Sequence, residues 1–376
     1  MKMDFGFNET QQMLRSTARD FLEAECTEAY VRSMELEKSG YTPELWDKMA
    51  QQGWIGLVFP EKFGGVGMGF LELTILLEEM GRALLPGPYF PTVLLSGLTI
   101  LEAGNEAQKK EWIPKITSGQ LISTLAFTEI SASLNPVDIN LSAEFNNGVF
   151  MLNGTKLFVP YANIADLLIV VARTGKSDQD LTMFLVPKSA QGISENQLKT
   201  IASDRQSEVT FTNVIVDERN LLGSVNGSWP ILEKILGMAA VAKSAEMLGS
   251  CDKVLEMTLN YVTHRTQFGR PIGTFQAIQH HCANMSIDLE GSRHLTYQAA
   301  WRLANNMESS SEIAMAKAWV SEASQRICAT AHQCHGAIGF TKEHSLQLYS
   351  RRVKANEIAF GDSDYHFEKV ALNIGL

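Results

Sequence analysis

The sequence contains few cysteines and no pattern that pairs them. Five cysteines are spread over 376 residues, an odd number, and none forms a CxxC pair. A disulfide framework favours an even number of closely spaced cysteines in a secreted chain, and a structural zinc site needs ligands at paired spacing. We therefore expect reduced thiols, a cytoplasmic protein and no metal site; the five thiols are Cys26, Cys251, Cys282, Cys328 and Cys334.

The chain also lacks an excess of positive charge and a long apolar run. Its formal net charge is −10 at pH 7, whereas nonspecific nucleic-acid binding needs a basic surface. Apolar stretches are interrupted by Gly, Lys or Glu well before they reach the roughly 20 residues that span a bilayer. Residues 1–5 show no apolar signal-peptide core. We expect no nucleic-acid binding, no membrane insertion and no export signal.

What the sequence does contain is typical of a globular protein. The 45% hydrophobic and 20% charged composition is ordinary for a packed domain. A length of 376 residues is enough for two or three domains, each with a buried core.

Helix signals dominate the first part of the chain, up to about residue 120. Asn8-x-x-Gln11 and Asn105-x-x-Gln108 are capping boxes, and Thr42-Pro43 is an N-cap followed by proline at the first helical position. The glycine-rich residues 60–69 miss the GxGxxG pattern, because Phe70 stands at the last glycine position. We interpret this stretch as a loop between helices.

The middle of the chain changes to short β-rich runs. These runs are separated by turn-forming stretches and cover residues 149–154, 167–171, 183–186 and 209–216. Residues 223–228 form a linker, and helical periodicity returns from Trp229 onward. The predicted fold is mostly α with a central β-domain: an N-terminal helical domain (1–120), a small antiparallel barrel-like or sandwich-like β-domain (121–226) and a C-terminal four-helix bundle (227–376).

Four short segments carry a more specific signal. They are Phe127-Thr128-Glu129, Asn153-Gly154-Thr155-Lys156-Leu157-Phe158, His264-Arg265-Thr266-Gln267-Phe268-Gly269 with Gln276 after it, and Gln333-Cys334-His335-Gly336-Ala337-Ile338-Gly339-Phe340. In order and spacing they resemble the acyl-CoA dehydrogenase family over essentially the whole chain.

The resemblance implies bound FAD and the residues that hold it. In this chain they would be Phe127, Thr128, Phe158, Arg265, Phe268, Gln276, Gln333 and Gly336. The residue types agree with this, because the planar fork of Arg265 suits a pyrophosphate oxygen and Gly336 would let backbone approach a ligand. The resemblance also places the 264–269 segment across a dimer interface, at the partner's FAD.

The departure with the greatest consequence is at the catalytic base. The family removes the α-proton of an acyl-CoA thioester with a carboxylate, and Phe360 aligns where that glutamate usually stands. The alternative position used by some members aligns near Ala239, which is not acidic either. Glu357 and Asp362 are the nearby carboxylates, each a candidate base and equally a solvated helix residue or a helix cap.

Three functions remain open from the sequence. The first is an acyl-CoA dehydrogenase that takes its base from elsewhere, with an acyl-CoA thioester as substrate and an electron-transferring flavoprotein as electron acceptor. The second is a non-catalytic partner subunit that completes the FAD site of a neighbouring chain. The third is another flavin reaction on the same fold. The resemblance implies a homotetramer or a heterotetramer with a paralogue.

Overall fold

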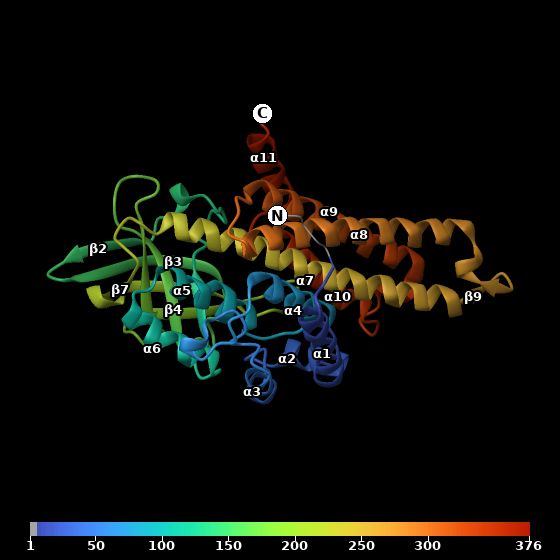
Figure 1. The fold of residues 1–376 in the computed structure, drawn as a ribbon, viewed down its shortest axis with the longest axis horizontal. Coiled ribbons are helices and arrows are strands. Elements are labelled where there is room, and N and C mark those ends of the chain that lie inside the picture. Colours follow the sequence, from blue (N-terminus) through green and yellow to red (C-terminus); the bar gives the residue numbers. More distant parts are fainter. Residues whose placement is uncertain (1–5) are drawn as a thin grey trace. The chain divides into compact units, whose positions relative to one another are not determined.

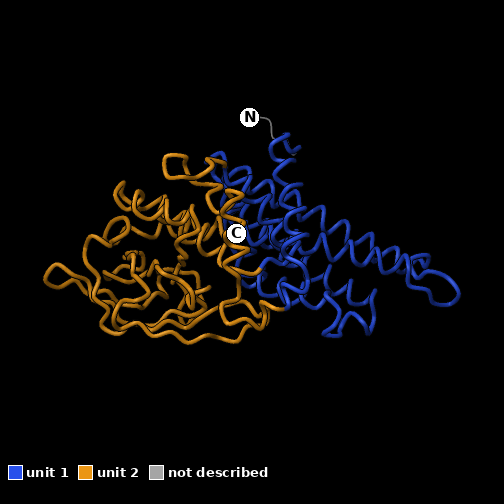
Figure 2. The backbone as a smooth tube through the Cα atoms, turned by 90° about the horizontal axis from the view of Figure 1, so that it is seen from below, with its two compact units in different colours: residues 1–32, 69–85, 240–376 blue, residues 33–68, 86–239 orange. Residues whose placement is uncertain are grey.

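The structure, a computed structural model, describes residues 6–376, so residues 1–5 and the expectation about an export signal lie outside it. The described chain forms two compact units, coloured separately in Figure 2. Of the described residues, unit 1 comprises 6–32, 69–85 and 240–376, and unit 2 comprises 33–68 and 86–239. Between residues 6 and 376, no helix has both the length and the apolar character needed to cross a bilayer.

Unit 1 is built from helices, of which α8 and α9 lie side by side over most of their length (Figure 1). Two of its helices, α2 and α7, continue into unit 2 along the chain. A short hairpin, β9–β10, joins α7 to α8. The elements are α1 (Glu9–Glu25), α2 (Glu28–Leu36), α4 (Phe70–Arg82), α7 (Trp229–His264), β9 (Thr266–Gln267), β10 (Arg270–Pro271), α8 (Gln276–Ala304), α9 (Ser310–His335), α10 (Leu346–Ile358) and α11 (Ser363–Asn373).

A buried carboxylate joins three helices of unit 1. The side chain of Glu78 on α4 is 2% exposed and accepts hydrogen bonds from Arg15 on α1 and from Arg293 and Tyr297 on α8. A buried carboxylate is tolerated only when its lone pairs are satisfied by such donors. These bonds therefore fix how α1 and α8 pack against α4.

Unit 2 combines short helices with the sheet. Its helical elements are α3 (Pro43–Gln51), a 3-10 turn (Glu61–Phe63), a π-helical segment (Phe90–Gly97), α5 (Leu98–Ala103) and α6 (Glu106–Thr117). Its strands are β1 (Ser123–Ala126), β2 (Ser142–Asn146), β3 (Val149–Pro160), β4 (Leu167–Arg173), β5 (Leu181–Pro187), β6 (Ile193–Leu198), β7 (Gln206–Asp217) and β8 (Leu221–Leu222). Phe150, Phe184 and Phe211 lie in the core that one face of the sheet buries.

The strands form one eight-stranded sheet in the order β6-β7-β3-β2-β4-β5-β8, with β1 paired to β4. Most neighbours are antiparallel, as predicted. The expectation of a purely antiparallel sheet is wrong at β4, which pairs in parallel with β1, in the register Ser123 with Leu167, and with the end of β2, at Ser142 with Arg173. The pairing path is open from β6 to β8, and barrel-like closure stays a prediction.

The capping signals located three helices correctly. The side chains of Asn8, Thr42 and Asn105 cap α1, α3 and α6 by accepting the N–H of Gln11, Leu45 and Gln108. The broad fold, mostly helical with a central sheet, is confirmed. The three-domain division at residues 120 and 226 stays a prediction, because the compact units group α1 and α4 with the later helices instead.

Candidate functional site

The predicted flavin-ring residues of unit 2 lie on adjoining segments. Residues 127–129 follow β1 directly, and the carbonyl of Thr128 accepts the N–H of Leu157 on β3 at 2.8 Å. The β3–β7 register shifts between Lys156 and Val159, and such a bulge re-aims a side chain. Phe158 sits in that bulge with φ +54° and is 47% exposed. The structure thus brings Phe127 and Thr128 next to Phe158.

A buried ion pair holds this arrangement together. Lys156 is fully buried, and its Nζ donates to Glu129 Oε1 at 2.7 Å and to the carbonyl of Phe127 at 3.0 Å. The Glu129 carboxylate also accepts the N–H groups of Asn140 and Leu141, at 2.8 and 2.9 Å. Burial lowers the pKa of Lys156 to about 8, and the charge of Glu129 opposes that shift. The pair ties the 127–129 segment to β3.

The other predicted flavin residues lie in unit 1, at the far ends of its long helices. Arg265 follows α7, Phe268 is at the tip of the β9–β10 hairpin, and Gln276 is the first residue of α8. Phe268 is 92% exposed with φ +52°. A phenyl ring held in a strained backbone and left open to water is the form expected of a ligand or partner contact.

The end of α9 approaches the end of α7 through an aromatic stack. The rings of Tyr261 and His335 stack with centroids 4.5 Å apart. Gly336 follows with φ +64°, and a Cβ placed there would meet open space within 4 Å. A hollow of about 500 Å³ lined by Asn260, Tyr261, His264 and Arg265 adjoins this stack. Arg265, Gln333 and Gly336 are all exposed, so a cofactor phosphate could reach the guanidinium and the bare backbone of Gly336.

The turn that carries Phe360 joins α10 to α11 within unit 1. Phe360 has φ +57°, and its carbonyl accepts a hydrogen bond from His366 Nε2 at 2.9 Å. Glu357 is buried, and its carboxylate accepts from Lys354 Nζ at 2.8 Å. Asp362 is the N-cap of α11 and accepts the N–H of Tyr365 at 2.9 Å. Both candidate bases thus have hydrogen-bonding roles within the fold.

His366 makes the stability of this turn depend on pH. Burial lowers the pKa of His366 to about 4, against the opposing effect of its bond to the Phe360 carbonyl. The unfolded chain, with a histidine pKa near 6.5, therefore binds a proton between about pH 6.5 and 4 while the folded chain does not. Stability contributed by His366 is complete above pH 6.5 and falls by about 3 kcal/mol as the pH drops to 4.

Thermal unfolding of the wild type and of His366→Gln between pH 7.5 and 4 measures this contribution. Glutamine retains an N–H donor near the Phe360 carbonyl but does not titrate, so we expect a shallower decline of the melting temperature. Burial also lowers the pKa of His332, His335 and His344, which is why the difference between the two proteins is the informative quantity. The exposed His280→Gln serves as control, and identical slopes for wild type and H366Q would contradict the assignment.

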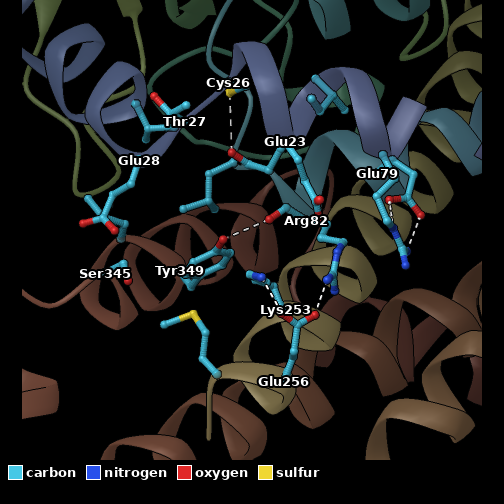
Figure 3. A pocket seen from close by; sticks show the side chains of 17 residues that line it. Glu23, Cys26, Thr27, Glu28, Glu79, Arg82, Lys253, Glu256, Ser345 and Tyr349 are labelled. Atoms are coloured by element: carbon cyan, nitrogen blue, oxygen red, sulfur yellow. Dashed lines mark hydrogen bonds and ion pairs between the residues drawn. The ribbon is translucent and has the colours of Figure 1, made fainter. Parts of the chain in front are cut away.

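A second hollow in unit 1, of about 510 Å³, is lined by residues of α1, α2, α4, α7 and α10 (Figure 3). Arg82 at its wall is paired with Asp252 at 2.6 Å and with Glu256. Tyr349 donates to the carbonyl of Arg82 at 2.9 Å. Burial raises the pKa of the Cys26 thiol to about 12, so it is no nucleophile at neutral pH. None of the flavin residues predicted from the sequence lines this hollow.

Comparison with known proteins agrees with the motif assignment. The matching family descriptions are "Acyl-CoA dehydrogenase, N-terminal domain" over residues 8–120, "Acyl-CoA dehydrogenase, middle domain" over residues 124–214 and "Acyl-CoA dehydrogenase, C-terminal domain" over residues 226–375. A Bacillus subtilis protein named acyl-CoA dehydrogenase is 30% identical, covering 94% of this chain and 95% of its own. This chain belongs to the acyl-CoA dehydrogenase family.

Two further relatives of this chain carry names that place them in complexes. The caffeyl-CoA reductase-Etf complex subunit CarC of Acetobacterium woodii is 31% identical, covering 95% of this chain and 96% of its own. A chain of the ChsE4–ChsE5 complex from Mycobacterium tuberculosis matches with a TM-score of 0.91 at 27% identity and covers 99% of both chains.

The buried hydrogen-bonding roles of three residues were not predicted from sequence, although the first lies in the 153–158 motif segment: Lys156, Lys317 and His366. A signal existed for Lys156, because it shares the inward parity of Phe150 and Leu152 on β3, and a buried lysine requires an acceptor. For His366 and Lys317 the acceptors are backbone carbonyls on other segments, and side-chain patterns do not reveal those.

Proposed function

We propose that this chain is an FAD-dependent oxidoreductase of acyl-CoA thioesters that catalyses α,β-desaturation. The observation that carries the proposal is the placement of Phe127, Thr128 and Phe158 on adjoining segments of unit 2, in a chain of this family. FAD, when bound, supplies the acceptor for the hydride that leaves the β-carbon. As that hydride leaves, the protein must remove one proton from the α-carbon, so that the electron pair of the C–H bond forms the double bond.

The residues described above fit FAD in chemistry, and all of them except the buried Phe127 and the half-buried Thr128 are exposed. Phe127 and Thr128 would hold the ring from backbone and hydroxyl groups, and Phe158 would cover it. Arg265 would donate to a phosphate oxygen, and Gly336 would allow close approach of backbone, with Phe268, Gln276 and Gln333 completing the adenosine side. Since Arg265 and Phe268 are exposed in unit 1, we assign them to the FAD of a neighbouring subunit.

The identity of the base decides between two forms of this function. In the first form Asp362 or Glu357 takes the α-proton. In the second form the chain is the non-catalytic partner in a mixed complex, and its exposed Arg265 and Phe268 complete the FAD site of a paralogue. The second form is supported by the phenyl ring at position 360, which cannot accept a proton. It is also supported by the hydrogen bonds that both carboxylates already accept, Glu357 from Lys354 and Asp362 from the first turn of α11.

The assembly and its surroundings are part of the same proposal. We propose a tetramer, formed with identical chains or with a paralogue, and an electron-transferring flavoprotein as electron acceptor. The two relatives from complexes, one with Etf and one of two chain types, support assembly with other proteins. We also propose a cytoplasmic setting and, for the chain itself, the three-domain division at residues 120 and 226.

Anaerobic titration of the FAD-loaded protein with acyl-CoA thioesters tests the function. The panel is butyryl-, octanoyl-, isovaleryl-, cyclohexanoyl- and glutaryl-CoA, each added to the chain alone and to the chain co-expressed with its candidate paralogue. Loss of flavin absorbance in either arm is the expected result. No bleaching in both arms would contradict the proposed function.

Two variants then separate the two forms. Asp362→Asn keeps an N-cap for α11, and Glu357→Gln keeps the side-chain shape, but neither can take a proton. If one carboxylate is the base, its variant loses bleaching while still binding FAD. If both variants bleach as the wild type does, and only with the paralogue present, the chain is the partner subunit.

A further inference from the structure

A fully buried lysine lies against the turn that carries Phe360. Lys317 is on α9 and is 0% exposed. Its Nζ donates to the carbonyls of Glu357 and Gly361, at 2.6 and 2.7 Å, and to Ser321 Oγ at 3.2 Å. An ammonium group has three donors, so all three are satisfied, and two of them by backbone of the α10–α11 turn.

This arrangement is costly, which argues that it serves a purpose beyond filling space. Desolvation lowers the pKa of Lys317 to about 7, a shift that Glu357 and Asp362 oppose and Lys243 reinforces. The Glu357 carboxylate itself binds Lys354, so the partner of Lys317 is the backbone at the C-terminal end of α10. That end carries the negative pole of the helix dipole, which favours a cation there.

The bonds of Lys317 bracket position 360. The two carbonyls belong to residues 357 and 361, and His366 holds the carbonyl of residue 360 between them. Phe360 has φ +57°, a conformation that costs a non-glycine residue about 1 kcal/mol or more and persists only when its surroundings fix it. The direction of the Cα–Cβ bond at position 360 is therefore set by α9 and α11, not by the side chain that it carries.

We infer that Lys317 is a positioning residue: by binding the carbonyls of residues 357 and 361, it sets the direction in which the side chain at position 360 projects toward the reacting acyl group. This inference rests on the proposed function, because only an acyl-CoA site gives position 360 a substrate. Lys317 itself does not touch substrate. In this chain it fixes where the phenyl ring of Phe360 lies, and in Phe360→Glu it would set the rate at which the introduced carboxylate removes the α-proton.

The test introduces a base and then removes the lysine. Phe360→Glu is compared with F360E/K317M, and F360E/K369M is the matched control, since Lys369 lies over the Tyr365 ring of α11. Anaerobic stopped-flow reduction with the best thioester of the panel gives a limiting rate and an apparent Kd. We expect K317M to lower the limiting rate at least ~10-fold with Kd changed less than ~3-fold, because misplacement affects the transition state more than binding. K369M should change neither.

Separate outcomes test the proposed function and the positioning role. No flavin reduction by F360E with any thioester counts against the proposed function, and an unchanged limiting rate in F360E/K317M overturns the role of Lys317. If K317M does not fold, Lys317→Gln replaces it. The rate of amide hydrogen exchange at residues 357–366, compared between K317Q, the wild type and K369M, then measures the order of the turn without any catalytic turnover. Exchange at least ~10-fold faster in K317Q alone supports the positioning role of Lys317, and equal exchange in all three proteins overturns it.

Discussion

Phe360→Glu is expected to reduce its own flavin with an acyl-CoA thioester at least about 100-fold faster than the matched Phe360→Gln. A positioned general base contributes roughly 10²- to 10⁴-fold to a proton transfer. The glutamate would occupy a turn whose backbone is already fixed by Lys317 and His366. Its φ of +57° is no more strained with glutamate than with the phenylalanine present. Stopped-flow absorbance of the FAD-loaded variants measures the rates.

Phe360→Gln is the control because it has the size of glutamate and cannot accept the proton. The rate of F360E should rise with pH as its carboxyl ionises, whereas the rate of F360Q should stay flat. Equal and slow rates for the two variants across the whole thioester panel would mean that position 360 does not face the substrate. A wild type as fast as F360E would instead place the base at Asp362 or Glu357.

The parts of the fold that could be predicted are those encoded locally. A capping side chain and its N–H partner are three residues apart, so Asn8, Thr42 and Asn105 located their helices. Alternation located β7, whose inward residues Val209 and Phe211 are buried. β1 was missed because its four residues are all buried and show no alternation, as expected for a strand in parallel pairing.

The candidate site was predictable only in part, for the same reason. Phe127 and Arg265 each lie in a short contiguous motif, so the sequence was enough to name them. The residues that hold them in place act over distance: Lys156 binds Glu129, 27 residues away, and Lys317 binds the carbonyl of Glu357, 40 residues away. A carbonyl acceptor has no side-chain identity, so no sequence pattern marks it. In the sequence, neither lysine differs from an ordinary solvent-exposed lysine of a strand or a helix.

Lys156→Met is expected to destabilise unit 2 by about 3 kcal/mol or more and to weaken its hold on FAD. Removing one member of a buried ion pair costs roughly 3–5 kcal/mol, because the other charge stays buried. Here the Glu129 carboxylate would keep two backbone N–H donors, while the carbonyl of Phe127 would lose its donor. Since that carbonyl belongs to the segment assigned to the flavin ring, FAD retention should fall together with stability.

Urea unfolding and the flavin-to-protein absorbance ratio of the purified variants check this, with Lys188→Met as the matched control. Lys188 is also in unit 2, but its Nζ makes no hydrogen bond with the described residues and lies 3.9 Å from Glu195, so its loss should cost less than about 1 kcal/mol. The double variant K156M/E129Q removes both charges and should recover part of the loss, because it leaves no uncompensated carboxylate. A double variant less stable than K156M would show that the backbone bonds of Glu129, rather than the ion pair, hold the 127–129 segment against β3.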